Sequence, residues 1–404
     1  MNRLVLIGNG FDLAHGLKTS YADFFYWYWR YRLYLITKES DFNISEDLLC
    51  KLKCVGYETW FMALMYDMDL KYAEGSEVYN YISNSDKYKK ELSPLFEKIT
   101  KSIETKGWVD IENEYYDLLK QYVLKNNDVS EIEYLNNQLY FLQERLVDYL
   151  KGIDISDNIL KTGIRQKIYA PFETTDISIG GTNALKEHVE YGLNQDNRDL
   201  DTKLRQYGSN CYTSGFVDDY RKKYGNKMLN VDELPKELLL PNQIMLLNFN
   251  YTHTAQLYCK SGSRFTVNQI HGDLEKPSSV IFGYGDELDD DYKTILNKNE
   301  NKFLGNIKSI KYLEADNYRR LLSFIESEPY QIIIMGHSCG NSDRTLLNTL
   351  FEHKNCASIK PYFHQIDNEH DDYIKIVQNI SRNFTDMKLM RDRVVNKTYC
   401  KPLT

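Results

Sequence analysis

The chain begins with a short apolar run that meets glycine at once. Residues 4–7 (LVLI) are followed directly by Gly8, Asn9 and Gly10. A continuous apolar run before a glycine-rich turn is typical of a parallel strand that is buried on both faces. Glycine in such a turn permits a tight reversal and close approach of another group to the backbone. The segment therefore predicts the first strand of an α/β sheet, with a turn suited to a nucleotide pyrophosphate.

Similar β-rich runs recur far along the chain, and a long helical stretch separates them from the first. The runs lie at 243–250, 266–272, 279–285, 330–338 and 359–366. Residues 108–125 and 130–153 instead place apolar residues at three- and four-residue spacing, which is typical of amphipathic helices. We therefore expect an α/β nucleotide-binding-type core with a mostly parallel sheet, formed by residues 1–20 and 240–404. Residues 21–239 are expected to be a large, mostly helical insertion, with a smaller insertion near 286–329.

Composition limits the classes of partner. The formal net charge of −8 gives no overall basic surface for a nucleic-acid backbone, so nucleic acid is not an expected partner. The seven cysteines lack paired metal-ligand spacing, so we expect no metal site, and they suggest no disulfide framework. No apolar run approaches the ~18 residues of a membrane span. We therefore expect a cytoplasmic protein that does not enter a membrane.

Polar side chains stand where several predicted strands end. In open α/β sheets, ligands bind just outside the carboxyl ends of the strands. The residues at these ends are Asn248, Asn250, Thr252, His271, Gly336, His337 and Ser338, with Asp343 at the start of the next helix. Each also has a purely structural interpretation: Asn250 can satisfy a turn, and His271 can be a buried hydrogen-bonding residue. Asp12, inside the first glycine turn, either caps the following helix or contacts a ligand.

The glycine turn does not match a dehydrogenase. The dinucleotide fingerprint requires a third glycine at a set spacing, whereas this chain has GNGFDL. No acidic residue ends a second strand about 20 residues later, where a dehydrogenase binds ribose. A conventional hydride-transfer enzyme is therefore excluded.

Taken together, the motifs resemble a known family. GNGFDLAHGL at the front, WVDIE at 108–112, LLNFNYTHT at 246–254, IHGD at 270–273 and IIIMGHSCGNSD at 332–343 occur in an order that resembles the bacterial abortive-infection AbiH family. The resemblance runs through most of the chain. It implies a role in antiphage (antiviral) defence by abortive infection.

The same order is similar to a distant version of the sirtuin-like NAD-binding fold. The counterparts of its motifs are Gly8-Asn9-Gly10, Gly16-Leu17, Asn250, His271-Gly272 and Gly336-His337-Ser338. The resemblance implies a Rossmann-like core with an NAD-type pocket. The chain departs from it at Asn9, at Lys18 and at Thr252, and it has no zinc-ribbon cysteine pairs. These departures argue against protein deacetylation and leave NAD binding or NAD cleavage.

The resemblance also implies roles for individual residues. NAD, or a related adenine dinucleotide, would be the ligand. Its binding set would be Gly8, Asn9, Gly10, Phe11, Asp12, Gly336, His337, Ser338 and Asp343. Asn250 would position a water molecule and His271 would take its proton, as in an NAD glycohydrolase. His253 and four further histidines have no comparable setting and are expected to be structural or exposed.

Two alternatives stay open. GHSCG at 336–340 has the spacing of a nucleophile elbow, with Ser338 as nucleophile of a serine hydrolase, although its available partners Asp367 and His370 are nearly adjacent. Alternatively, the protein is a non-catalytic nucleotide sensor that acts through a partner defence protein or a homo-oligomer. In the helical insertion, Trp108, Asp110 and Glu112 either begin a helix or reach the pocket as a lid.

Overall fold

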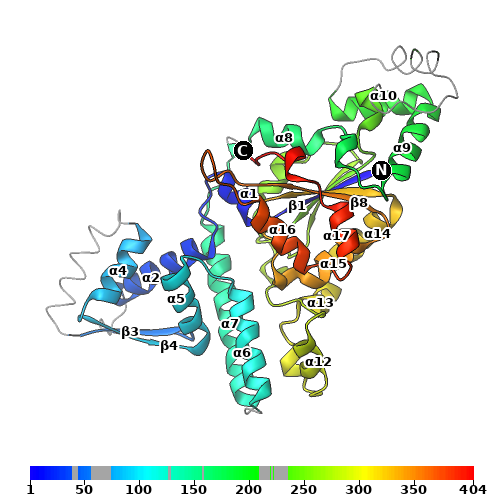
Figure 1. Ribbon diagram of the computed structural model, residues 1–404. Helices are drawn as coiled ribbons and strands as arrows, with labels where there is room; N and C mark the ends of the chain where they lie inside the picture. The colour runs from blue at the N-terminus through cyan, green and yellow to red at the C-terminus, as the bar shows by residue number, and fades with distance from the viewer. Residues whose placement is uncertain are drawn as a thin grey trace. The chain divides into compact units, whose positions relative to one another are not determined.

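The chain folds into two compact units. The computed structural model describes residues 1–38, 44–55, 74–125, 129–156, 159–208, 219, 222 and 235–404 (Figure 1). The first unit comprises Met1–Leu17, Ile155–Val280 and Lys311–Thr404, and the second comprises Lys18–Asp154 and Ile281–Ile310. The first unit contains most of the predicted core, which is expected at residues 1–20 and 240–404. It also contains the chain between residue 155 and that core.

A five-stranded parallel sheet forms the centre of the first unit. Its strands are β1 (Asn2–Ile7), β5 (Ile244–Asn248), β6 (Phe265–Gln269), β7 (Tyr330–Met335) and β8 (Cys356–Tyr362). They are ordered β6-β5-β1-β7-β8, and every neighbouring pair is parallel. The prediction of an α/β fold with a mostly parallel sheet is therefore confirmed.

The strand order places β1 at the centre of the sheet. The chain moves outward on one side through β5 and β6, then returns to the other side of β1 for β7 and β8. In register, Ile7 pairs with Asn248 on one side and with Met335 on the other. The carboxyl ends of β1, β5 and β7 therefore lie side by side, and the order of strands reverses between β1 and β7.

The predicted strand at 279–285 is wrong. This segment contains only the end of a short 3-10 helix (Pro277–Ser279) and one isolated bridge, from Tyr284 to Ile307. A Cβ atom added at Gly283 would overlap the carbonyl oxygen of Asn306. The apolar run is therefore buried by packing against another loop, which its composition alone does not distinguish from burial in a sheet.

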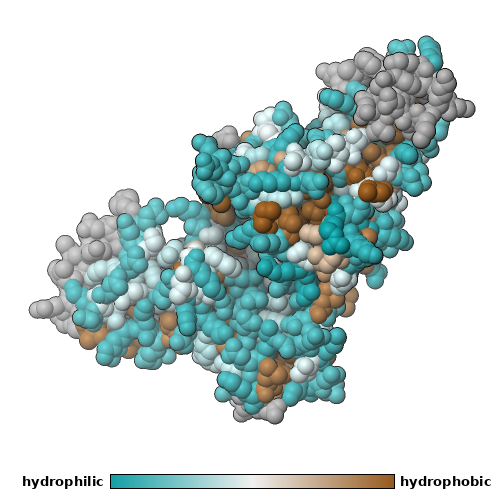
Figure 2. Space-filling view, viewed as in Figure 1, coloured by the Kyte–Doolittle hydropathy of each residue, from teal (hydrophilic) through white to brown (hydrophobic). Residues whose placement is uncertain are grey.

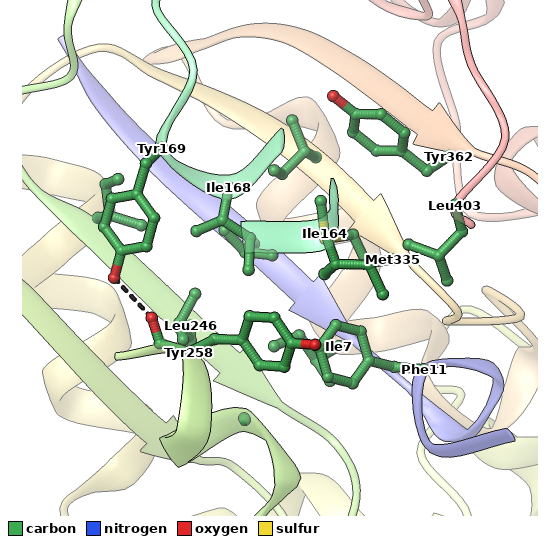
Figure 3. Close-up of a cluster of buried hydrophobic side chains, with 14 of the residues drawn as sticks. Ile7, Phe11, Ile164, Ile168, Tyr169, Leu246, Tyr258, Met335, Tyr362 and Leu403 are labelled. Carbon is green, nitrogen blue, oxygen red and sulfur yellow. Dashed lines mark hydrogen bonds between the residues drawn. The ribbon is translucent and has the colours of Figure 1, made fainter. Parts of the chain in front are cut away.

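One face of the sheet is covered by α8 (Thr162–Tyr169) and the 3-10 helix η5 (Thr254–Tyr258) (Figure 3). Alternate strand residues point to this face, as the period of two requires. They include Val5, Ile7, Ile244, Leu246, Ile333 and Met335, which pack with Ile164, Ile168, Tyr169 and Tyr258. Tyr169 also donates a hydrogen bond to the Tyr258 carbonyl at 2.8 Å. Each fully buried aliphatic side chain contributes about 1.5–3 kcal/mol of transfer free energy.

The first unit contains further helices. They are α1 (Asn9–Ala14), α9 (Thr182–Asn194), α10 (Asn197–Tyr207), α14 (Asn317–Ser327), α15 (Arg344–Glu352), α16 (Tyr373–Arg382) and α17 (Met387–Arg393). Helix α14 contacts β6, whereas α15, α16 and α17 contact β8 (Figure 1).

The second unit combines helices with a small antiparallel sheet. Its helices are α2 (Tyr21–Lys38), α4 (Gly75–Asn84), α5 (Pro94–Lys106), α6 (Ile111–Leu124), α7 (Val129–Lys151) and α12 (Asp290–Leu296). Its strands are β2 (Ile44–Glu46), β3 (Cys50–Cys54) and β4 (Tyr88–Leu92), in the order β2-β3-β4. The sequence analysis did not identify these strands. They are short and carry charged residues, so no apolar run marks them.

The aromatic run of α2 forms part of the core of this unit. Phe24, Phe25, Tyr28 and Trp29 are each no more than 1% exposed. Phe25 packs edge-on against Tyr79 of α4, with the ring centroids 4.9 Å apart. These four side chains of the run are therefore core residues, whereas Tyr26 and Trp27 between them are half-buried.

The two acids of the WVDIE motif have structural partners inside the second unit. Asp110 caps α6 and accepts a hydrogen bond from the Asn113 backbone N–H at 3.1 Å. Glu112 is buried and pairs with the ammonium group of buried Lys308 at 2.7 Å. Glu112 also accepts the Gly283 N–H at 3.1 Å, so it joins α6 to segment 281–310.

No helix in the described part of the chain combines the length and the apolar character that a bilayer crossing requires. The face drawn in Figure 2 is mostly hydrophilic, with apolar residues in small separate patches.

We predict that Lys308→Met destabilises the second unit by about 3–5 kcal/mol, because it leaves the buried Glu112 carboxylate without its ion-pair partner. The double variant Glu112→Gln/Lys308→Met should recover most of that loss. Lys293→Met is the control, since its pair with Asp290 is exposed and is worth about 1 kcal/mol or less. Urea unfolding measures all three, and equal losses for Lys308→Met and Lys293→Met would contradict the prediction.

Candidate functional site

The glycine loop after β1 packs directly against the end of β7. A Cβ atom at Gly8 would lie 2.5 Å from the His337 Cα, and one at Gly10 would lie 2.9 Å from the Gly336 Cα. Gly336 has a φ of +73°, and a Cβ atom there would overlap the Phe11 backbone nitrogen. The Gly10 N–H donates to the Gly336 carbonyl at 2.8 Å. On the side of their missing side chains, these glycines are therefore approached by the protein's own backbone.

The loop after β5 is tied to the glycine loop through two asparagines. Asn248 accepts the Asn250 N–H at 3.1 Å and donates to the Thr252 carbonyl at 2.9 Å, so Asn248 holds the turn. The side-chain amide of Asn250 donates to the Gly8 carbonyl at 3.0 Å. Asn250 thus spans from the end of β5 to the end of β1. The carbonyl oxygen of its side chain takes no hydrogen bond in the described part of the chain and is available as an acceptor.

Two histidines from separate strand ends lie on either side of one carboxylate. Nε2 of His271, beyond β6, is 3.2 Å from Asp343 Oδ1, and Nε2 of His337, beyond β7, is 3.6 Å from Asp343 Oδ2. All three residues are less than 9% exposed. His337 Nδ1 accepts the Cys339 N–H at 3.0 Å, so neutral His337 carries its proton on Nε2, toward Asp343. Asp343 therefore lies within hydrogen-bond distance of His271 Nε2 and faces Nε2 of His337 at a longer distance.

Aromatic rings line this cluster. The Phe249 ring lies 4.1 Å from the His337 ring and 5.3 Å from the His271 ring, measured between centroids. Tyr312 stacks parallel to His271 at 6.2 Å, and its hydroxyl is 3.2 Å from His271 Nε2. Such surroundings exclude water and strengthen the electrostatic interactions within them.

Asp12 is a buried acid beside the same loops. It does not cap α1, where Gly8 occupies the capping position, and instead its Oδ2 accepts the Thr252 hydroxyl at 2.5 Å. Its Oδ1 is buried and has no hydrogen-bond partner among the described residues. Burial raises the pKa of Asp12 from 3.8 to about 6, although the hydrogen bond from Thr252 opposes the shift. A carboxyl with a pKa near neutrality is suited to proton transfer.

The geometry of GHSCG does not favour a nucleophile elbow. The strained, left-handed backbone position belongs to Cys339, with a φ of +54°, and Ser338 is exposed beside it. Burial raises the pKa of the Cys339 thiol, so this thiol is not a reactive thiolate. The acid and base available to Ser338, Asp367 and His370, are exposed and pair with each other at 2.9 Å.

The predicted site residues divide into three groups. Contacts connect Gly8, Gly10, Asn250, Gly336, His337, Asp343 and His271, with Asp12 joined to the same loop through Thr252. Asn9 and Ser338 are exposed. Phe11 instead enters the hydrophobic core, where its ring packs edge-on against Tyr258 at 5.2 Å (Figure 3).

Sequence reasoning missed one pair at this edge. His253 is expected from the sequence to be structural or exposed, and in the structure its Nε2 donates to Asp273 Oδ1 at 2.8 Å. The available signal was position, since His253 lies one residue beyond Thr252 and Asp273 lies two beyond His271. Among the described residues, no group of three or more histidine, cysteine or carboxylate side chains has the arrangement of a metal site.

Comparison with known proteins identifies one family. A family model described as Bacteriophage abortive infection AbiH matches residues 4–365, which run from β1 to just beyond β8. No curated protein and no solved structure matches the chain.

We predict that Gly336→Ala is far more destabilising than Gly16→Ala. Both glycines have positive φ angles, +73° and +79°, so each alanine incurs about 1–2 kcal/mol of backbone strain. Only Gly336 has a neighbour in the way of the new Cβ, because nothing lies within 4 Å of that position at Gly16. Urea unfolding compares the two variants, and equal losses would mean that the contact between the glycine loop and β7 is loose.

We predict that the free energy of unfolding of Asp12→Asn, relative to that of the wild type, increases between pH 4 and pH 7. The pKa of Asp12 is about 6 in the folded protein and 3.8 in the unfolded chain. The protonated Asp12 of the wild type therefore favours folding below pH 3.8, and this contribution is lost as the pH rises to about 6. At ~1.4 kcal/mol per pKa unit, the variant should gain about 2–3 kcal/mol on the wild type between these pH values. Asp290→Asn is the exposed control. Urea unfolding at both pH values would contradict the prediction if Asp12→Asn shows no gain over this control.

Proposed function

The chain belongs to the bacteriophage abortive infection AbiH family, and from that premise we propose that it defends against phage by binding and hydrolysing an NAD-type dinucleotide. The family suggests the defence role. The dinucleotide and its cleavage are inferred from the chemistry of the strand ends in the first unit.

One observation carries the proposal: polar groups from β1, β5, β6 and β7 converge at the carboxyl edge of the sheet. Asn250 bonds to the Gly8 carbonyl, Gly8 packs on His337, and Asp343 lies between His337 and His271. Counted along the chain, the strand order is 3-2-1-4-5, the order of dinucleotide-binding Rossmann sheets. In such sheets the ligand binds where the order reverses, which here is between β1 and β7.

The groups at this edge suit cleavage of a glycosidic bond. Breaking the bond between nicotinamide and ribose develops positive charge on the sugar, which nearby carboxylates stabilise. The Asp12 carboxylate is fully buried beside these loops, and one of its oxygens has no partner in the described structure, so its negative charge would stabilise the developing positive charge without touching the substrate. The side-chain oxygen of Asn250 would accept a hydrogen of the attacking water, because its amide N–H is already held by Gly8.

We predict that purified protein releases nicotinamide from NAD, and that Asn250→Ala and His271→Ala each lower the rate by about 100-fold or more. The assay is run with and without extract of phage-infected bacteria, since the trigger is unidentified. Asn297→Ala is a matched control on the exposed end of α12 and should keep the wild-type rate. Thermal melting confirms that each variant is folded.

Calorimetric titration with NAD separates binding from turnover. Binding without release would leave a nucleotide sensor as the function. If NAD gives no binding heat and no nicotinamide is released, with or without the extract, the proposal is wrong.

A further inference from the structure

A second histidine–carboxylate pair lies at the edge of the strand-end cluster. His253 Nε2 is 2.8 Å from Asp273 Oδ1, and the two side chains are 32% and 31% exposed. The pair is therefore open to solvent, whereas the side chains of His271, His337 and Asp343 are 6%, 5% and 10% exposed. Asp273 Oδ1 also accepts the Glu275 N–H at 2.8 Å, which fixes the carboxylate on its loop.

Both members of this pair are anchored to the loops of the proposed site. Thr252, next to His253, donates to Asp12 and accepts at its carbonyl from Asn248. Gln269, at the end of β6, donates to the same Thr252 carbonyl at 3.3 Å. Hydrogen bonds therefore connect the loops that follow β5 and β6, and the side chains of His253 and Asp273 lie on the solvent-exposed side of these bonds.

The pair leaves one imidazole nitrogen available. Nε2 faces the carboxylate, so neutral His253 carries its proton there and presents Nδ1 as a base, as in acid–base triads. Nδ1 has no hydrogen-bond partner within the described residues. His271 differs, because its Nε2 lies 3.2 Å from both Asp343 and Tyr312 in a nearly closed environment. A proton taken up by His253 passes directly to solvent.

We propose that His253, oriented by Asp273, is the residue that accepts the proton of the attacking water at this strand edge. The inference rests on the proposed function and assigns to His253 the step that the sequence analysis gave to His271. His271, held beside Asp343, then serves to bind and orient the substrate.

The step balances without a further reactant. The water oxygen forms a bond to C1′ of the ribose while the bond from C1′ to the nicotinamide nitrogen breaks. The bonding pair leaves with nicotinamide, which departs neutral because it was cationic in NAD. One water proton moves to His253 Nδ1, and the imidazolium beside Asp273 then releases a proton to solvent.

The first test maps accessibility and ligand contact without a variant. Diethyl pyrocarbonate acylates neutral, accessible imidazoles, and mass spectrometry locates the product. We expect His253 to react faster than His271 or His337. NAD at 1 mM, about the upper end of the ~1 μM to 1 mM range of typical KM values, should slow the reaction of His253 several-fold. His370 is the matched control, since it also pairs with an aspartate, is 70% exposed and follows β8 at the opposite edge of the sheet.

The second test measures turnover. His253→Gln keeps an amide that can donate to Asp273 but cannot take up a proton. It should lower kcat for nicotinamide release by about 100-fold with KM unchanged. Asp273→Asn retains an oxygen for the Glu275 N–H and should lower kcat by about 10-fold or more, again with KM unchanged. His370→Gln should match the wild type.

The outcomes separate this inference from the proposed function. If the wild type releases nicotinamide and His253→Gln is equally fast, the assignment of the base is wrong while NAD cleavage stands. Equal slowing of His253 and His370 by NAD in the modification experiment would likewise overturn it. If the wild type neither binds nor cleaves NAD, both the inference and the proposed function fall.

Discussion

The strand-end cluster depends on one close backbone contact. Gly8 and Gly10 meet Gly336 and His337 at distances that leave no room for a Cβ atom. Because β1 and β7 are hydrogen-bonded neighbours, the contact continues their pairing beyond the strands and fixes where both loops turn. The Gly8 carbonyl accepts a hydrogen bond from the Asn250 side chain. His337 faces Asp343, which also lies beside His271. The positions of the polar groups at the carboxyl edge of the sheet therefore depend on glycine at positions 8, 10 and 336.

The burial of several of these polar groups is unfavourable for the free energy of folding. Asp12 is ionised at neutral pH although burial opposes its charge, and one of its oxygens has no partner in the described structure. Asp343 is buried between two imidazoles that both pack against the Phe249 ring. Groups under such strain are concentrated at functional sites, because binding and catalysis use the interactions that the folded protein leaves unsatisfied.

Sequence alone predicted the parts that follow from local pattern. The continuous apolar runs of β1, β5 and β7 indicated a parallel sheet, and shared strand ends brought Asn250, His271 and Asp343 into one prediction. Parts that depend on distant packing escaped it. The run at 279–285 has the composition of a strand, but Gly283 packs on Asn306, and the strands β2 to β4 lack an apolar run. Pairing of His253 with Asp273 depends on how the loops after β5 and β6 approach each other, which spacing in the sequence does not reveal.

The most direct measurement is an electron-density map of the protein soaked with ADP-ribose, the product that retains both phosphates and both riboses. We predict density at the carboxyl edge of the sheet between β1 and β7, with a ribose within hydrogen-bond distance of Asn250 and His253 facing the anomeric carbon. Density elsewhere on the molecule, or none at saturating ligand, would contradict it.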